Sequence, residues 1–155
     1  MSDATEHKIS HEAYFGSPQT VKSEWDGRQV DWLLQWLGGF INQTNVHIGI
    51  TLTVGGNMIT GTLIPHSAYF ERLAKDMSAP FAASGGDAQK TLHDRIIRFN
   101  DPVDPGTELP IQYIHLDNAR VHTGGNQILP SKGTLWRGKL SAVEGFILGE
   151  LNVNK

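Results

Sequence analysis

The stretch that decides the fold reads His47-Ile-Gly-Ile-Thr-Leu-Thr-Val-Gly-Gly-Asn-Met-Ile-Thr-Gly-Thr-Leu-Ile64. Its first half alternates apolar residues with small or polar ones, which is the period-two pattern of a strand with one buried face. The residues predicted on that face are Ile48, Ile50, Leu52 and Val54. Gly55-Gly56 then supplies two residues that tolerate positive φ, as a tight type I′ turn requires. A second strand follows, and Gly61 in its interior indicates a bend or the close approach of another backbone. The stretch is therefore predicted to be a β-hairpin.

An apolar segment before the hairpin has the periodicity of a helix. Asp26 and Gln29 have the spacing of a helix N-cap and its reciprocal partner, so the helix is expected to begin at Asp26. Gly38-Gly39 marks a point where it ends or loosens. The residues expected on its apolar stripe are Val30, Leu33, Leu34, Leu37 and Ile41.

Beside that stripe, Trp32, Trp36 and Phe40 recur at every fourth position and form a second stripe on the helix. We call these three residues the aromatic stripe. A helix that is apolar on both sides either packs between two layers of the protein or offers one side to a partner. Both interpretations of the aromatic stripe stay open.

After the hairpin, Pro65 and Ser67 end the strand and can cap a second helix. The residues spaced for its buried face are Phe70, Leu73, Ala74 and Met77. Pro80 and Ser84-Gly85-Gly86 end this helix. Residues 87–99 fit either a short helix or a strand.

The rest of the chain alternates loops and strands. Residues 100–106 have the composition of a loop, and strands are expected at about 110–116 and in a pair from about 134 to 151. Asp117 and Asn118 are interpreted as turn formers.

Composition narrows the function. The 155 residues carry a formal charge of −3, with no run of Lys or Arg that would attract nucleic acid or an anionic membrane. The absence of cysteine excludes disulfides, thiolate metal sites and cysteine catalysis. No apolar run approaches the roughly 20 residues of a membrane span, and the N-terminus has no signal-peptide core. We expect a cytoplasmic protein with no membrane partner.

No pattern predicts catalysis or a cofactor. Among the seven histidines, only His7 and His11 have the spacing of a helical metal motif, and both fall in the polar N-terminal residues. The sequence contains no Gly-x-Ser-x-Gly elbow and neither of the glycine-rich phosphate-binding motifs. We expect no metal, no cofactor and no enzyme activity.

Trp136-Arg137-Gly138 is the most distinctive polar and aromatic cluster of the distal strands. Alternation places Trp136 and Arg137 on opposite faces of a strand. If Trp136 points inward, Arg137 points outward, where its guanidinium can bind a carboxylate of a partner or of this chain. Both possibilities stay open.

Two blocks of the sequence resemble a known family. The proximal block consists of Gly49-Ile-Thr-Leu-Thr-Val-Gly-Gly56, Ile59-Thr-Gly61, Leu63-Ile64 and Tyr69-Phe70. The distal block consists of Tyr113-Ile-His-Leu116, Asn118-Ala-Arg120, Pro130, Gly133, Leu135-Trp-Arg-Gly138, Val143-x-Gly-Phe146 and Leu148-Gly149. In order and spacing they resemble the gas vesicle accessory protein U family (GvpU) over about residues 30 to 152. The resemblance implies a non-enzymatic cytoplasmic protein that assembles, organises or clusters gas vesicles, with the vesicle shell or other gas vesicle proteins as partners.

The order of elements also resembles that of Sm-like barrels, in which a helix precedes a five-stranded, strongly bent antiparallel sheet. Leu135-Trp-Arg-Gly138 stands where the second Sm motif has an apolar residue followed by Arg-Gly. Sm proteins carry a nucleotide-contacting Asn before the closing strand, and Tyr113 stands at that place here. An RNA-binding Sm-like module that uses Arg137 and the loop near Asn57 is therefore the alternative function, and the negative net charge counts against it.

The predicted fold is mainly β with α, in the α+β class: a small, strongly bent antiparallel barrel of Sm/SH3-like type. A helix precedes the barrel and a helical insertion interrupts it at about residues 66–100. Residues 1–25 are expected to form a flexible arm and residues 26–155 a single domain.

The residues that we hypothesise to contact partners are Trp32, Trp36, Phe40 and Arg137. The exposed edge strands of the sheet are a further contact surface, because an edge pairs readily with the backbone of another chain. Pairing of edges head to tail would also build assemblies of identical chains, so a homo-oligomer is expected.

Overall fold

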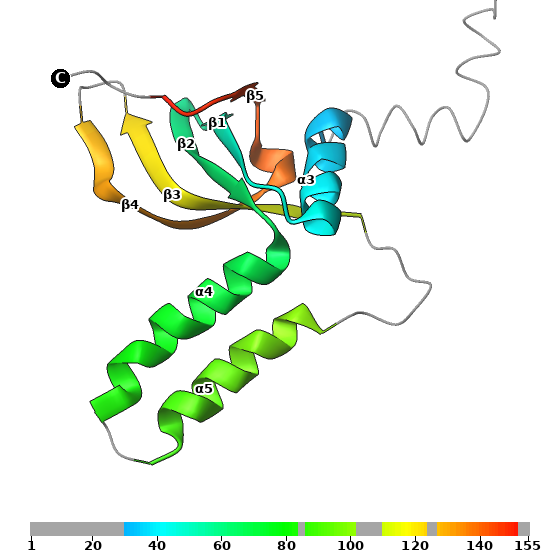
Figure 1. The fold of residues 1–155 in the computed structure, drawn as a ribbon. Helices are drawn as coiled ribbons and strands as arrows, with labels where there is room; N and C mark the ends of the chain where they lie inside the picture. Colours follow the sequence, from blue (N-terminus) through cyan, green and yellow to red (C-terminus); the bar gives the residue numbers. More distant parts are fainter. Residues whose placement is uncertain (1–29, 84–85, 102–109, 124–126, 152–155) are drawn as a thin grey trace, which may run out of the picture.

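The computed structural model describes residues 30–83, 86–101, 110–123 and 127–151, and these form a five-stranded antiparallel sheet with three α-helices (Figure 1). The strands lie in the order β4-β3-β2-β1-β5. The elements are α3 (Trp32–Thr44), β1 (Ile48–Val54), β2 (Asn57–Ile64), α4 (His66–Ser78), α5 (Ala88–Ile97), β3 (Tyr113–Thr123), β4 (Gln127–Lys139) and β5 (Gly145–Leu148). Short 3₁₀ helices cover Ala79–Ala83, Arg98–Asn100 and Leu140–Ala142.

The predicted α+β class is confirmed, with a helix before the sheet and helices inserted between its second and third strands. Figure 1 shows β3 and β4 curving along their length, so that the sheet is bent. It is open, because β4 and β5 end the strand order and do not pair with each other. The expected arm at residues 1–25 lies outside the described residues.

The predicted hairpin is confirmed. β1 and β2 pair in an antiparallel register that runs from Ile48 opposite Leu63 to Val54 opposite Asn57. Gly55 and Gly56 form the turn with φ values of 56° and 75°, which the type I′ geometry needs at both positions.

The helix before the hairpin starts later than predicted. Its N-cap is Asp31, whose Oδ1 accepts hydrogen bonds from the backbone N–H groups of Leu33 (2.8 Å) and Leu34 (3.2 Å). The predicted cap at Asp26 is therefore wrong for this helix. An Asp immediately before the first helical residue satisfies two of the N–H groups that the first turn leaves unpaired.

The same helix does not end at Gly38-Gly39 but continues to Thr44. Gly38 is buried, and a Cβ built on it would lie 3.7 Å from the side chains of Ile111 and Ile114. The glycine pair therefore lies where α3 approaches these two residues, and the helix ends only at Asn45, which adopts a left-handed φ of 59°.

The segment between β2 and β3 forms a helical hairpin of α4 and α5. Of the two structures that the sequence allows for residues 87–99, a helix or a strand, the chain therefore adopts mainly the helix. Ser67 is not the cap of α4. Pro65 holds the N-cap position, and the N–H of His66 donates to Oδ1 of Asn42 on α3 (2.8 Å). Met77 was expected in the core but is 49% exposed near the far end of α4, where the hairpin extends away from the sheet (Figure 1).

Two apolar clusters hold these layers together. The first joins α3 to one face of the sheet, and its buried residues are Leu34, Leu37, Ile41, Ile50, Leu52, Ile59, Leu63, Ile114, Leu116, Ala119 and Leu140. The second joins α4 and α5 to the end of β2, and its buried residues are Ile64, Tyr69, Phe70, Ala74 and Ile96. The first cluster contains Ile50 and Leu52, with Ile48 and Val54 partly buried against it, as the alternation predicted.

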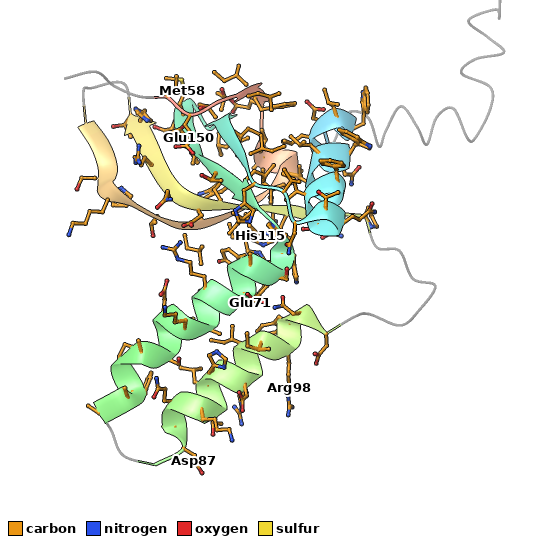
Figure 2. The ribbon with its side chains drawn as sticks, viewed as in Figure 1. Met58, Glu71, Asp87, Arg98, His115 and Glu150 are labelled. Atoms are coloured by element: carbon orange, nitrogen blue, oxygen red, sulfur yellow. The ribbon has the colours of Figure 1, made fainter. Side chains whose placement is uncertain are left out.

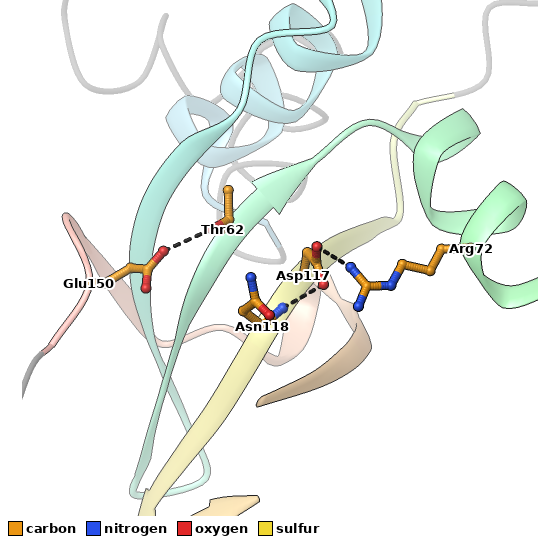
Figure 3. A network of polar contacts seen from close by, with 5 residues as sticks. All are labelled: Thr62, Arg72, Asp117, Asn118 and Glu150. Carbon is orange, nitrogen blue, oxygen red and sulfur yellow. Dashed lines mark hydrogen bonds and ion pairs between the residues drawn. The ribbon is translucent and has the colours of Figure 1, made fainter. Parts of the chain in front are cut away.

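The face of the hairpin away from α3 carries threonines, and the chain after β5 crosses it. The hydroxyl of Thr51 donates to the carbonyl oxygen of Gly149 (2.8 Å). The hydroxyl of Thr62 donates to Oε1 of Glu150 (2.8 Å; Figure 3). These bonds give partners to hydroxyl groups that the fold removes from water.

β3 contains a bulge at Asp117 and Asn118, so these residues interrupt a strand rather than form the predicted turn. Asn118 has a φ of 50°. Gly61 lies against the bulge: a Cβ there would lie 2.8 Å from the carbonyl oxygen of Asp117 and 3.0 Å from Cα of Ala119. The predicted close backbone approach at Gly61 is confirmed.

The bulge also directs the Asp117 carboxylate to Arg72 of α4, with which it forms an ion pair (Figure 3).

The Gly61→Ala variant should therefore lose about 1–3 kcal/mol of stability, because the added methyl group meets backbone atoms that cannot rotate away. The matched control is Gly145→Ala, where nothing lies within 4 Å of the added Cβ, and its stability should stay within about 0.5 kcal/mol of the parent. Urea unfolding of both variants measures the difference. Equal midpoints would show that the contact at Gly61 does not constrain the sheet.

Candidate interaction surface

The aromatic stripe lies on the outer side of α3. Trp32 is 72% exposed, Trp36 59% and Phe40 37%. The rings of Trp36 and Phe40 stack on each other, with centroids 5.6 Å apart and planes 18° apart. Within the described part of the chain, α3 is thus packed on one side only. That the aromatic stripe serves as a contact surface stays a prediction.

The inner side of α3 fixes the stripe in place. Leu34, Leu37 and Ile41 are buried in the first cluster, and Nε2 of Gln35 donates to the carbonyl oxygen of Ile111 (3.0 Å). The helix contains no Asp, Glu, Lys or Arg from Trp32 to Thr44. The stripe is therefore apolar, uncharged and attached to a helix that is anchored in the core.

Arg137 lies on the other face of the sheet and is not brought together with the stripe. Trp136 packs on the first cluster, whereas Arg137 is exposed and pairs in register with His115. Its guanidinium carbon lies 4.1 Å from the ring centroid of Tyr113 and 5.6 Å from that of Phe70. No carboxylate forms an ion pair with Arg137 among the residues that the structure describes, and the aromatic rings take that place through cation–π contacts.

His115 is the buried centre of the junction between α4 and the sheet, and Figure 2 shows it where the sheet meets the start of that helix. It is 4% exposed, and its ring centroid lies 4.3 Å from that of Tyr69 and 5.5 Å from that of His66. Its Nε2 has no hydrogen-bond partner among the described residues. We call His66, Tyr69, Phe70, Tyr113, His115 and Arg137 the aromatic junction.

Burial gives the aromatic junction unusual proton affinities. Removal from water, with the neighbouring His66 and Arg137 as smaller contributors, lowers the pKa of His115 to about 3. Burial also raises the pKa of Tyr69, although Arg137 opposes that shift. His115 is therefore neutral at pH 7 and acts as an aromatic packing residue.

The aromatic junction was not predicted from the sequence. The alternation of Ile114 and Leu116 with His115 would have placed the histidine on the opposite face of the strand from the first cluster. Nothing in the local pattern indicates that α4 covers that face, because the helix lies far from β3 along the chain.

The described residues contain no group of three or more His, Asp or Glu side chains placed to hold a metal ion. None of the helices in this part of the chain is long and apolar enough to cross a membrane.

These features define a small α+β protein with an open, bent antiparallel sheet and a docked helix that exposes aromatic side chains. Residues 31–151 match the model of the family described as Gas vesicle protein GvpU-like. The match covers most of the chain, so the chain belongs to the GvpU-like family of gas vesicle proteins, and the resemblance of the sequence to the gas vesicle accessory protein U family is confirmed. Neither the curated proteins nor the solved structures contain a match.

The aromatic junction predicts an acid-sensitive fold. The pKa of His115 is about 3 in the folded chain and about 6.5 when exposed, so between these values the unfolded chain binds more protons. Stability should therefore fall as the pH decreases from 6.5 towards 3.

The His115→Phe variant keeps an aromatic ring but cannot be protonated, and its stability should fall less over the same pH range. Urea unfolding at several pH values measures both curves, and their difference removes the contribution of the carboxylates that the two proteins share. Parallel curves would contradict a buried neutral histidine.

Proposed function

We propose that this protein is a non-enzymatic accessory factor in the assembly, organisation or clustering of gas vesicles, and that it acts through protein–protein contacts and self-association. The partners would be the vesicle shell or other gas vesicle proteins. The protein would be cytoplasmic, associated with the vesicles, and would need no cofactor. Membership of the GvpU-like family supports the link to gas vesicles.

The observation that carries the contact role is the exposed aromatic stripe. Tryptophan and other large rings contribute most to binding at protein interfaces, because they bury a large apolar area and lose little conformational entropy. On α3 these rings stand on a helix that the core already holds in place, so a partner would meet a rigid surface.

The edges of the sheet and Arg137 offer further contacts. Among the strands that the structure describes, β5 pairs with β1 alone, and its Ile147 and Leu148 are exposed. Its free edge could accept a strand of another chain. The exposed Arg137 is held over Tyr113, and the N–H groups at the rim of its guanidinium could bind a carboxylate of a partner.

No observation favours the RNA-binding alternative. Tyr113 stands at the place of the nucleotide-contacting residue of Sm proteins, and the guanidinium of Arg137 lies over its ring.

A flotation experiment tests the proposed function. Purified full-length protein is mixed with intact gas vesicles, the vesicles are floated by centrifugation, and the protein in the buoyant layer is quantified. We expect co-flotation of the parent protein and a reduction of several-fold in the Trp36→Glu variant, because a carboxylate replaces an apolar contact.

The matched control is Met77→Glu, which places the same charge on an exposed apolar position of α4 and should leave co-flotation unchanged. Circular dichroism verifies that both variants are folded. If the parent protein stays in the lower layer at every salt concentration tested, direct contact with the vesicles is contradicted.

A further inference from the structure

We propose that the occupant of the aromatic stripe is a second copy of this chain, with the two α3 helices packed antiparallel about a two-fold axis through Trp36. This inference rests on the proposed function, in which the stripe is a protein contact, and it names the partner of that contact.

The spacing of the stripe suits pairing with itself. In an antiparallel pair related by a two-fold axis, a residue on the axis faces its own copy, and residues equally far from it on either side face each other. Trp36 is the central residue of the stripe, and Trp32 and Phe40 lie four positions before and after it. Trp36 would therefore face Trp36, and each Trp32 would face a Phe40 of the other copy.

The absence of charge on α3 favours a copy of the same chain over a charged partner. Residues near a two-fold axis lie close to their own copies, so any charge there would face a like charge. α3 carries none between Trp32 and Thr44. The charged residue nearest to Trp36 in the sequence is the N-cap Asp31, five residues before it, so the two Asp31 residues would lie about 15 Å apart along the helix axes. That separation exceeds the screening length of about 8 Å at physiological salt.

The exposed area sets the strength of the pairing. The stripe and the neighbouring Leu33, which is also exposed, could bury on the order of 400 Å² per copy. A stable standard interface buries about 800 Å² per partner. We therefore expect a weak and reversible dimer, which chains concentrated on one surface would populate more fully than chains in dilute solution.

Sedimentation of the full-length chain alone tests the inference, over protein concentrations up to about 1 mM. The parent protein should show a reversible monomer–dimer equilibrium. The Trp36→Glu and Trp36→Lys variants should each weaken it by at least about tenfold, because each places like charges on the axis. An equimolar mixture of the two variants should restore dimerisation, since opposite charges then meet.

Met77→Glu and Met77→Lys are the matched controls, and neither should change the equilibrium of the parent protein. A second readout uses the absence of cysteine from the chain. Under a mild oxidant, Trp36→Cys should form a disulfide-linked dimer faster than Met77→Cys, because only the residue on the axis meets its own copy.

A parent protein that remains monomeric at the highest concentration overturns the inference. A mixture of the two charged variants that does not dimerise overturns it as well, because residue 36 then does not face itself. The flotation experiment is scored separately. A monomeric protein that co-floats with vesicles would contradict only the dimer, and a dimer that stays below the vesicles would contradict only the direct contact with the vesicles.

Discussion

The contact between Gly61 and the bulge of β3 is the constraint on which the rest of the fold depends. At this point the backbones of β2 and β3 approach so closely that no side chain fits between them. Gly133 of β4 meets Asn118 on the same bulge, where an added Cβ would lie 2.8 Å from its Cα. The bend is thus fixed by backbone packing across three strands, which side-chain rearrangement cannot relieve.

The bulge also determines how the helical hairpin is attached. It turns Asp117 towards Arg72 of α4, and in the regular ladder just before it His115 lies between Ile64 and Arg137. The exposed ion pair contributes little to stability by itself. The apolar and aromatic contacts of α4 with Ile64, His115 and Arg137 contribute more to stability, because they remove large surfaces from water. The helical hairpin of α4 and α5 is therefore positioned by the sheet into which it is inserted.

Features set by neighbouring residues could be predicted from the sequence, and features set by distant contacts could not. The hairpin, its glycine turn and the opposite orientations of Trp136 and Arg137 follow from local periodicity. The spacing of Asp26 and Gln29 predicts a cap at Asp26, but the structure places the cap of α3 at Asp31, so this local pattern alone does not fix where the helix begins. The sequence also shows the aromatic stripe, but only the structure shows whether a second layer of the protein covers it.

The exposed stripe is a cost to the isolated chain, and in the function that we propose it is a source of binding energy for a complex. The inner residues of α3 already anchor the helix, so its packing on the sheet does not need Trp32 and Trp36. Exposed separately, such side chains would be ordinary, but here they are adjacent and lie on an uncharged helix whose inner side is buried in the core. Their apolar area is removed from water only when a partner covers it. In a chain of the gas vesicle family, this arrangement favours a contact that forms when the chains or their partners are concentrated.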